Sequence, residues 1–326
     1  MAPLTAGVIL DRRFRLTVPL GRTAAARGTG AVWRATELGT GADVAVKVLA
    51  AHLAGDTVAE ARFRLAVRTI TQLTSPEVTR VLDCGEITQP GGFAVPYVVR
   101  ELADGRPLAG LLGGVPLPLD EALRVVATAA DALAVAHRAG LAHGRIQPGN
   151  VIVGPDRVRI TDFGLGGFSP GPAGRDAGSA ARRGAGAGYG AGPGLTAGSG
   201  RGWTADGLLS YQAPELAAGG APAPAADVYA VGVLFAACLA GAEPSAGAAV
   251  RVAARAIPAS LAGLWAACLA ASPRDRPGAA HVAVLVRQAL AELVGPALTA
   301  SGPWPVMAAS SRPARRPASP AARWPG

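Results

Sequence analysis

Apolar and polar side chains alternate along much of the first hundred residues. In residues 43–49 (DVAVKVL) the valines occupy one face, while Ala45 and Lys47 lie on the other. A period of two residues is typical of a half-buried β-strand. Further strands are predicted at residues 13–20, 31–35, 78–84 and 96–102, with one helix at residues 57–73. The pattern predicts a small lobe of antiparallel strands with a single helix.

Beyond residue 105 the apolar period becomes helical. Between Asp120 and Gly140 one stripe of mainly apolar side chains recurs at the spacing of an amphipathic helix, and His137 lies on it. Asp120 is the predicted N-cap, Gly140 the predicted terminator, and His137 a packed or boundary residue rather than a ligand. Two short strands are predicted at residues 150–153 and 157–161, and further helices at residues 226–240, 261–271 and 278–293.

Two segments lack the large apolar side chains that a core requires. Residues 166–202 are rich in Gly, Ala, Pro and Ser, and residues 300–326 in Pro, Ala, Ser and Arg. Such compositions cannot bury enough surface to offset the loss of conformational entropy on folding. Both segments are therefore predicted to be disordered.

Composition narrows the functional classes. The formal net charge is +9, but the arginines are scattered and no basic stripe with interleaved aromatic residues is present, so no nucleic-acid partner is expected. The three cysteines include no C-x-x-C pair, which favours a reducing compartment over a disulfide framework or a zinc site. The longest apolar run, residues 228–242, is shorter than the ~18 residues that a membrane span needs. These features predict a cytoplasmic protein without a membrane span.

Lys47 is the single lysine of a chain that has 31 basic residues. Where the composition disfavours lysine so strongly, the one that is present is a candidate for a specific role. A casual surface position is the alternative for a strand lysine, and its uniqueness argues against it.

Two short motifs lie at the centre of the chain. Residues 143–150 read HGRIQPGN and residues 161–164 read TDFG, so that Asn150 precedes Asp162 by twelve residues with a strand–turn–strand pattern between them. Other motifs follow in a fixed order: VAVK at residues 44–47, APE at 213–215, DVYAVG at 227–232 and RP at 276–277. In this order the chain resembles the bacterial eukaryotic-type (Hanks-type) serine/threonine protein kinases.

The resemblance implies an α+β, bilobal protein-kinase-like fold. Residues 10–103 would form a β-rich N-lobe, and residues 104–295 a mainly helical C-lobe. The activation segment would carry a long disordered insertion at about residues 166–202, and residues 296–326 would be a disordered basic tail. It also implies an ion pair between the glutamate of the APE motif and the arginine of the RP motif, Glu215 and Arg276.

The same resemblance implies ligands and the residues that hold them. ATP and Mg²⁺ are the expected cofactors, with weakened binding, because the glycine-rich loop is degraded and the helix offers no well-placed acid. Asn150 and Asp162 take the two metal-binding positions. The implied nucleotide-binding residues are Gly28, Gly30, Val32, Ala45, Lys47, Glu101 and Ala103.

Several catalytic positions are replaced together. Arg145 stands at the position of the catalytic aspartate, Gln147 at that of the catalytic-loop lysine, and Leu208 at that of a threonine before the APE motif. Ala66 occupies the position of the helix glutamate that pairs with the strand lysine, and the register does not favour Glu60 instead. An arginine cannot accept a proton at ordinary pH, and general-base help typically contributes about 10²–10⁴-fold to rate. The loop therefore predicts a metal site without a catalytic base.

Three functional hypotheses follow. The leading one is a pseudokinase that binds a nucleotide and acts as a scaffold or allosteric regulator for a protein partner, such as another kinase or its substrate. The second is an active or weakly active serine/threonine kinase with rearranged residues, and the third is an interaction module that binds no nucleotide. Arg100 precedes the predicted hinge at residues 101–103. This arginine either narrows the back of the adenine pocket or reaches an acid such as Asp162.

Overall fold

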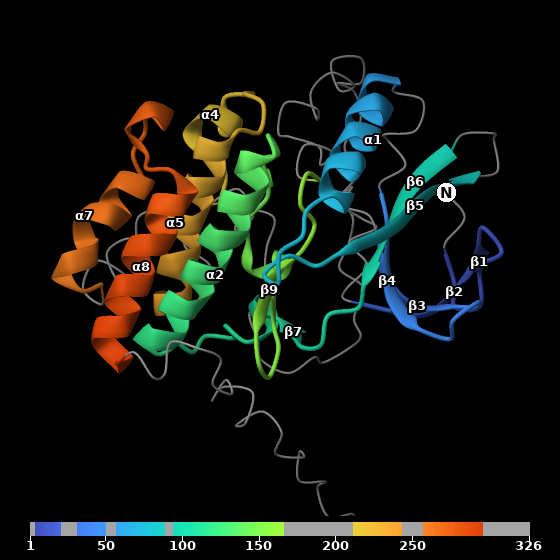
Figure 1. The fold of residues 1–326 in the computed structure, drawn as a ribbon, viewed down its shortest axis with the longest axis horizontal. Helices are drawn as coiled ribbons and strands as arrows, with labels where there is room; N and C mark the ends of the chain where they lie inside the picture. Colours follow the sequence, from blue (N-terminus) through green and yellow to red (C-terminus); the bar gives the residue numbers. More distant parts are fainter. Residues whose placement is uncertain are drawn as a thin grey trace, which may run out of the picture.

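The structure is a computed structural model. It describes residues 4–20, 31–49, 57–88, 94–165, 211–242 and 257–295. The predicted disordered segments, the glycine-loop residues Gly28 and Gly30, and Leu208 lie outside the described residues. Figure 1 shows a sheet and a helix on one side of the molecule and a group of helices on the other.

The N-lobe is built on a six-stranded antiparallel sheet with the order β1-β2-β3-β4-β6-β5. Its strands are β1 (Ile9–Leu10), β2 (Phe14–Pro19), β3 (Val32–Glu37), β4 (Asp43–Val48), β5 (Val81–Thr88) and β6 (Ala94–Glu101). The valines of β4 join the apolar cluster on one face of this sheet, as their alternation predicts. Lys47 and Ala45 consequently face the other side, toward the C-lobe.

Helix α1 (Thr57–Thr71) covers the opposite face of the sheet. Phe63 and Val67 from the helix pack with Leu49 and Val98 from the sheet region and with Leu165 from the C-lobe. This small cluster therefore joins the helix both to the sheet and to the segment that follows the TDFG motif.

The C-lobe is mainly helical. Its helices are α2 (Leu119–Arg138), α4 (Pro214–Ala217), α5 (Pro224–Ala240), α7 (Ala259–Cys268) and α8 (Ala279–Val294), with short 3₁₀ turns at Leu108–Gly110, Pro148–Asn150 and Pro273–Asp275. Helix α2 packs against α5 and α8, and these helices share one apolar core. None of the helices among the described residues is long and apolar enough to cross a membrane.

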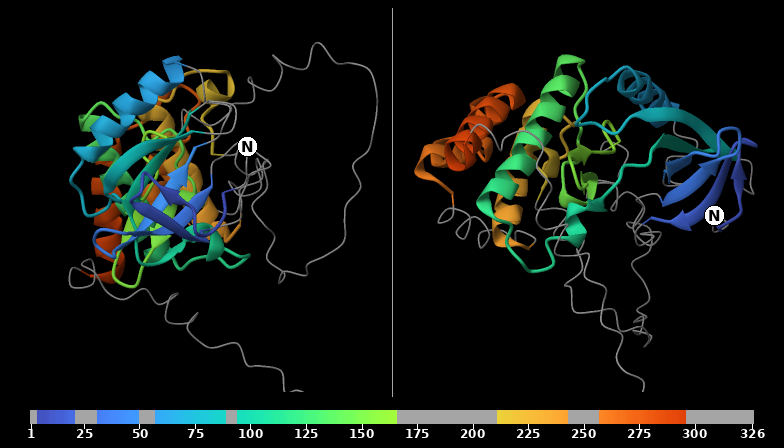
Figure 2. Two further views of the ribbon diagram at one scale, coloured as in Figure 1. Left: turned by 90° about the vertical axis from the view of Figure 1, so that its right-hand side faces the viewer. Right: turned by 60° about the horizontal axis from the view of Figure 1, so that its bottom comes forward.

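A small antiparallel sheet lies where the lobes meet (Figure 2). It has the order β7-β8-β9, formed by β7 (Arg106–Pro107), β8 (Val151–Val153) and β9 (Val158–Ile160). Ile160 donates its N–H to the carbonyl of Glu77 at 2.7 Å and accepts from the N–H of Thr79 at 3.0 Å. The segment before β5 is thus bonded to the strand that leads into the TDFG motif. The architecture is the bilobal α+β fold that the resemblance implies.

Several element boundaries differ from the sequence expectations. The helix predicted at residues 261–271, for example, spans Ala259–Cys268. Asp120 is not the N-cap of its helix. Helix α2 begins at Leu119, and Pro118 occupies the N-cap position without a side-chain hydrogen bond. Asp120 lies in the first turn, where its charge still favours the helix dipole. The predicted strand at residues 78–84 begins only at Val81, because Val78 forms an isolated bridge with Ile160. Gly140, in contrast, follows the C-cap of α2 with φ +74°, a conformation that suits glycine at a helix end.

Candidate functional site

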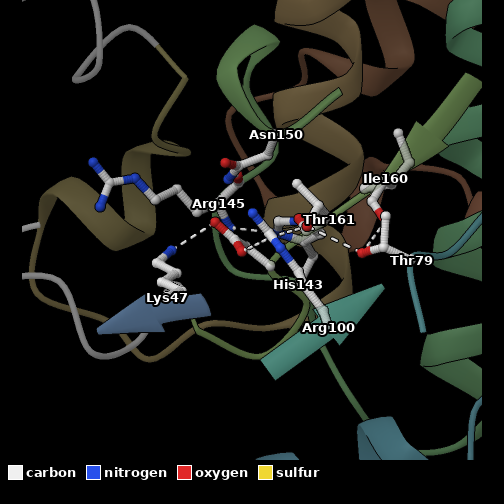
Figure 3. Close-up of polar contacts among 9 residues, drawn as sticks. Lys47, Thr79, Arg100, His143, Arg145, Asn150, Ile160 and Thr161 are labelled. Atoms are coloured by element: carbon white, nitrogen blue, oxygen red, sulfur yellow. Dashed lines mark hydrogen bonds and ion pairs between the residues drawn. The ribbon is translucent and has the colours of Figure 1, made fainter. Parts of the chain in front are cut away.

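Strand β4 and the TDFG motif meet through one ion pair. The Lys47 Nζ lies 2.6 Å from Oδ2 of Asp162, and the two side chains are only 16% and 8% exposed. The two residues are 115 positions apart in sequence and come from different lobes. The pairing brings together two of the residues that the sequence singled out (Figure 3).

Arg100 binds the other oxygen of the same carboxylate. Its Nη1 contacts Oδ1 of Asp162 and also the hydroxyl of Thr161, and its side chain is 12% exposed. Strand β6 lies between β4 and β5 in the sheet, which fixes the backbone from which this side chain extends. Of the two placements expected for Arg100, the structure shows the one that reaches Asp162.

The backbone of the TDFG motif has an unusual conformation at two positions. Asp162 has φ +68°, a left-handed conformation that aspartate tolerates better than most residues, and Gly164 also has φ +68°. A Cβ at Gly164 would lie 3.2 Å from Cβ of Ala66 and 3.3 Å from Cδ1 of Ile70. Helix α1 therefore approaches the motif closely, and it does so with small and apolar side chains.

His143 is fully buried and has a defined tautomer. Its Nε2 lies 2.9 Å from the carbonyl oxygen of Thr161, which requires a proton on Nε2, and its Nδ1 accepts the N–H of Arg145 at 3.1 Å. The ring packs against Phe163 with a centroid distance of 4.5 Å. Burial lowers the pKa of His143, which agrees with a neutral ring that has no room for a second proton. This histidine positions the loop and is not available as a base.

Asp227, in the first turn of α5, binds the backbone of the loop that begins at His143. Its carboxylate accepts the N–H groups of His143 and Gly144, each at 2.7 Å, and contacts Nε2 of His137 at 2.9 Å. The residue is 1% exposed, so these bonds compensate for the burial of its charge. Gly144 has φ +75°, which glycine adopts without cost. His137 is a packed, hydrogen-bonded residue, as predicted.

Arg145 occupies the position where the resemblance places a catalytic base. Its carbonyl accepts Nδ2 of Asn150 at 2.9 Å, so that the amide oxygen of Asn150 is the atom left for a ligand. Figure 3 shows the Arg145 side chain extending away from Asn150 and Thr161. Burial lowers the pKa of Arg145, opposed by Asp162, but a guanidinium keeps its proton in proteins. Gln147 contributes its carbonyl to the same turn by accepting the N–H of Asn150 at 2.9 Å.

The charges of the site act on one another. Burial alone would raise the pKa of Asp162, but Arg100 and Lys47 outweigh it and hold that pKa well below its usual range. Burial lowers the pKa of Lys47, as do the neighbouring cations Arg100 and Arg145, while Asp162 raises it. The described charges that act on Lys47 are thus one carboxylate and two arginines.

This arrangement does not fit a resident divalent cation. Mg²⁺ needs oxygen ligands at about 2.0–2.1 Å, and both oxygens of Asp162 are already in contact with cations. At an effective dielectric constant of about 20, unit charges about 4 Å apart interact by about 4 kcal/mol, and a divalent ion doubles this. The ion would gain one such attraction from Asp162 and meet repulsions of the same order from Lys47 and Arg100. The metal-binding role of Asn150 and Asp162 stays a prediction that these contacts disfavour.

The remaining predicted nucleotide residues line the edge of the same site. Ala45 is buried on β4 beside Lys47, and Val32 pairs with Lys47 in register. Glu101 directs its carboxylate away from a ligand, since Oε1 accepts the N–H of Arg80 at 3.0 Å and lies 3.1 Å from Nη1 of Arg159. The N–H of Glu101 is also bonded, to the carbonyl of Arg80 at 2.9 Å, so a contact of Glu101 with an adenine would use its backbone carbonyl. The roles of these residues in binding stay predictions.

The predicted ion pair between the APE glutamate and the late arginine is present. Arg276 donates from Nη1 and Nη2 to the two oxygens of Glu215 at 2.6 and 2.8 Å. The guanidinium also donates to backbone carbonyls and lies over the ring of Tyr229 at 5.0 Å. This bidentate pair anchors α4 to the segment before α8.

Several residues of the site were not predicted from the sequence. Thr79 donates its hydroxyl toward Thr161 at 3.0 Å, and both are buried. Arg159 holds Glu101, and Asp227 holds the loop of His143. No local pattern marks Thr79 or Arg159, because their contacts join segments far apart in the chain. Asp227 lies within a recognised motif, and that motif was the signal available for it.

Comparisons with known proteins agree with this geometry. A family model described as the protein kinase domain matches residues 26–284. The chain is 34% identical over 243 residues to the serine/threonine-protein kinase PknA of Mycobacterium tuberculosis, a match that covers 74% of this chain and 50% of that protein. It is 35% identical over 158 residues to the probable serine/threonine-protein kinase SCO3848 of Streptomyces coelicolor, covering 48% of this chain and 23% of that protein. The chain therefore spans half or less of the length of these relatives.

Solved structures show the same fold. The kinase domain of Mycobacterium tuberculosis PknI superposes with a TM-score of 0.63 at 24% identity, and the match covers 88% of this chain and 99% of that one. At this level of identity the superposition shows that the two chains share a fold. The match of the family model over most of the chain, together with these relatives, shows that the chain belongs to the protein kinase family, among the bacterial Hanks-type serine/threonine kinases.

Proposed function

We propose that this protein is a pseudokinase, which binds a nucleotide between its lobes and regulates a protein partner without transferring phosphate. The observation that carries the proposal is Arg145 at the position of the catalytic base. Protein kinases use that position to accept the proton of the substrate hydroxyl. A guanidinium cannot accept it.

The neighbouring titratable groups do not replace the lost base. Both ring nitrogens of His143 are engaged within the loop, and its pKa is lowered by burial. Asp162 is paired with Lys47 and Arg100, which hold its pKa well below the usual range and make it a poor proton acceptor. These contacts support a site in which binding is kept and proton transfer is lost.

A phosphotransfer assay tests the catalytic half of the proposal. We expect the native protein to transfer radiolabelled phosphate from ATP to itself or to a generic protein substrate no faster than the Lys47→Ala variant. Arg145→Asp restores the family residue and is the matched comparison, because a general base contributes about 10²–10⁴-fold. Clear activity of the native protein that Arg145→Asp does not improve would show that the protein is an active kinase.

Thermal denaturation with and without ATP tests the nucleotide half. A ligand that binds only the folded state at about 100 times its Kd stabilises by about 2.7 kcal/mol, which raises Tm by several degrees. We expect ATP to raise the Tm of the native protein, and Lys47→Ala to lose this shift. Arg64→Met, which removes an exposed ion pair between Arg64 of α1 and Glu86 of β5, should keep this shift.

An interaction module that binds no nucleotide is the second candidate. It is favoured by the ion pairs of Lys47 and Arg100 with Asp162, because these three side chains already bind one another without a ligand. A native protein that shows neither a thermal shift with ATP nor a fluorescence change with a nucleotide analogue would support this candidate. In both cases we propose a signalling role in the cytoplasm, with another kinase or its substrate as the partner.

A further inference from the structure

The cation that neutralises Asp162 is part of the protein itself. Arg100 contacts Oδ1 of Asp162 while Lys47 holds Oδ2, so that each carboxylate oxygen faces a side-chain cation. The Arg100 side chain is 12% exposed, and its Nη1 also contacts the Thr161 hydroxyl. The guanidinium is therefore bound by two consecutive residues, Thr161 and Asp162, which directly follow β9.

The position of Arg100 is determined by the sheet. Its backbone pairs with Ala45 of β4 and with Val81 of β5, so that it belongs to an inner strand. Thr161 is in turn bonded to Thr79, which lies beside the backbone bridge between Val78 and Ile160. If Arg100 moved away, the Asp162 carboxylate and the Thr161 hydroxyl would both lose a hydrogen-bond donor.

The charge balance of the described residues favours an anion without a metal. Lys47 and Arg100 contact Asp162, so that two positive charges meet one negative charge. Arg145 adds a third positive charge that acts on the same group of residues. A divalent cation would add positive charge to an excess that is already positive. The same excess of positive charge would attract a polyphosphate. Arginine and lysine side chains bind phosphoryl groups in this way in other proteins.

We propose that Arg100 takes the place of the divalent cation, so that this site binds the polyphosphate of a nucleoside triphosphate in its metal-free form. The inference rests on the proposed function for the presence of a nucleotide, and it adds the chemical form in which that nucleotide is bound. Arg100 is a binding residue in this account: its guanidinium neutralises Asp162 and faces the phosphates together with Lys47. The amide of Asn150 would then be a hydrogen-bonding group rather than a metal ligand.

Titration with ATP in two buffers tests the inference directly. The native protein is titrated in excess Mg²⁺ and again in excess EDTA, with binding followed by calorimetry. We expect the two dissociation constants to agree within about threefold, since no metal contact is lost in EDTA. Arg100→Met keeps an unbranched apolar stem and removes the charge, and for this variant we expect ATP to bind at least about tenfold more tightly in Mg²⁺ than in EDTA.

Mn²⁺ provides a second readout that does not depend on the affinity for ATP. We expect the electron paramagnetic resonance signal of free Mn²⁺ to be unchanged by the native protein and reduced by Arg100→Met when ATP is absent. Arg100→Lys keeps a cation and should behave as the native protein does, and Arg64→Met is the control for loss of an arginine elsewhere in the same lobe. If Arg100→Met does not fold, the native titrations and Arg100→Lys still decide the matter.

The outcomes separate the inference from the proposed function. Native binding of ATP that weakens about tenfold or more in EDTA, or Mn²⁺ bound by the native protein, would overturn the metal-free form and leave the pseudokinase proposal standing. No binding of ATP in either buffer would overturn both the inference and the nucleotide half of that proposal. Phosphate transfer by the native protein would overturn the proposal that it lacks catalytic activity.

Discussion

At the scale of single residues, the chemistry of this protein turns on what surrounds Asp162. The aspartate sits in a left-handed backbone conformation and is paired by Lys47 at 2.6 Å and by Arg100 at its other oxygen. In a buried pair, removing one partner leaves the other charge uncompensated, which costs about 3–5 kcal/mol. The same carboxylate that a kinase would offer to a metal ion here joins the two lobes.

The pairing of Asp162 predicts a pH dependence of stability. Its pKa is lower in the folded protein than in the unfolded chain, so its contribution to stability is full above the unfolded pKa of about 4 and is lost as pH falls toward the folded pKa. Asp162→Asn should therefore lower the free energy of unfolding by about 3 kcal/mol at pH 7. The difference from the native protein should narrow as pH falls below about 4.

Denaturant unfolding between neutral and acid pH measures this effect. Asp83→Asn is the control, since Asp83 pairs with Arg13 at a surface where both side chains are more than a third exposed, and such pairs contribute about 0–1 kcal/mol. A loss for Asp162→Asn that stays constant down to pH 3, or equals that of the control, would show that the pairing with Lys47 and Arg100 does not stabilise the fold.

At the scale of elements, helix ends in the C-lobe show how glycine is used. Gly140 after α2 and Gly241 after α5 both have left-handed backbones, with φ +74° and +66°. A Cβ at Gly140 would meet nothing within 4 Å, whereas a Cβ at Gly241 would lie 2.2 Å from the backbone carbon of Val115. The two positions share a conformation but differ in their surroundings, so they separate backbone strain from steric exclusion.

This contrast predicts two different losses of stability. Gly140→Ala should lower the free energy of unfolding by about 1 kcal/mol, the cost of a left-handed alanine. Gly241→Ala should lower it by about 2–4 kcal/mol, because the methyl group also displaces the chain at Val115. Equilibrium denaturation of both variants checks the difference. Equal losses would mean that the segment at Val115 yields without cost.

The ends of the strands were harder to predict than the existence of the strands. The β4 strand was predicted to within one residue because its valines alternate into one core. The strand after residue 78 was predicted to start too early, because Val78 is apolar but bridges to Ile160 in the other sheet instead of joining β5. An apolar side chain indicates burial and does not say which partner buries it.

At the scale of the whole molecule, the lobes are joined by more than the chain that connects them. Leu165 packs with Phe63 and Val67 of α1, while His143 packs against Phe163 in the C-lobe. Ala66 lies beside Gly164, so the part of α1 that approaches the TDFG motif carries a methyl group and no carboxylate. Lys47 pairs with Asp162, and this ion pair joins β4 to the TDFG motif.

The sequence by itself determined the two lobes and the order of the motifs, and it predicted Arg145 at the position of the catalytic base. These follow from local periods and from residue types at set spacings, which are properties of short segments. The pairing of Glu215 with Arg276 was also implied, because each belongs to a motif whose order along the chain was clear.

Only the tertiary structure decided what Arg100 does. Its sequence position allowed either a narrowed adenine pocket or a contact with Asp162, because the choice depends on how the two lobes meet and Asp162 lies 62 positions further along the chain. The same is true of Thr79, Arg159 and the bonds that Asp227 makes to the loop of His143. Long-range polar contacts are set by how the packed elements meet, and no periodicity within a segment encodes that meeting.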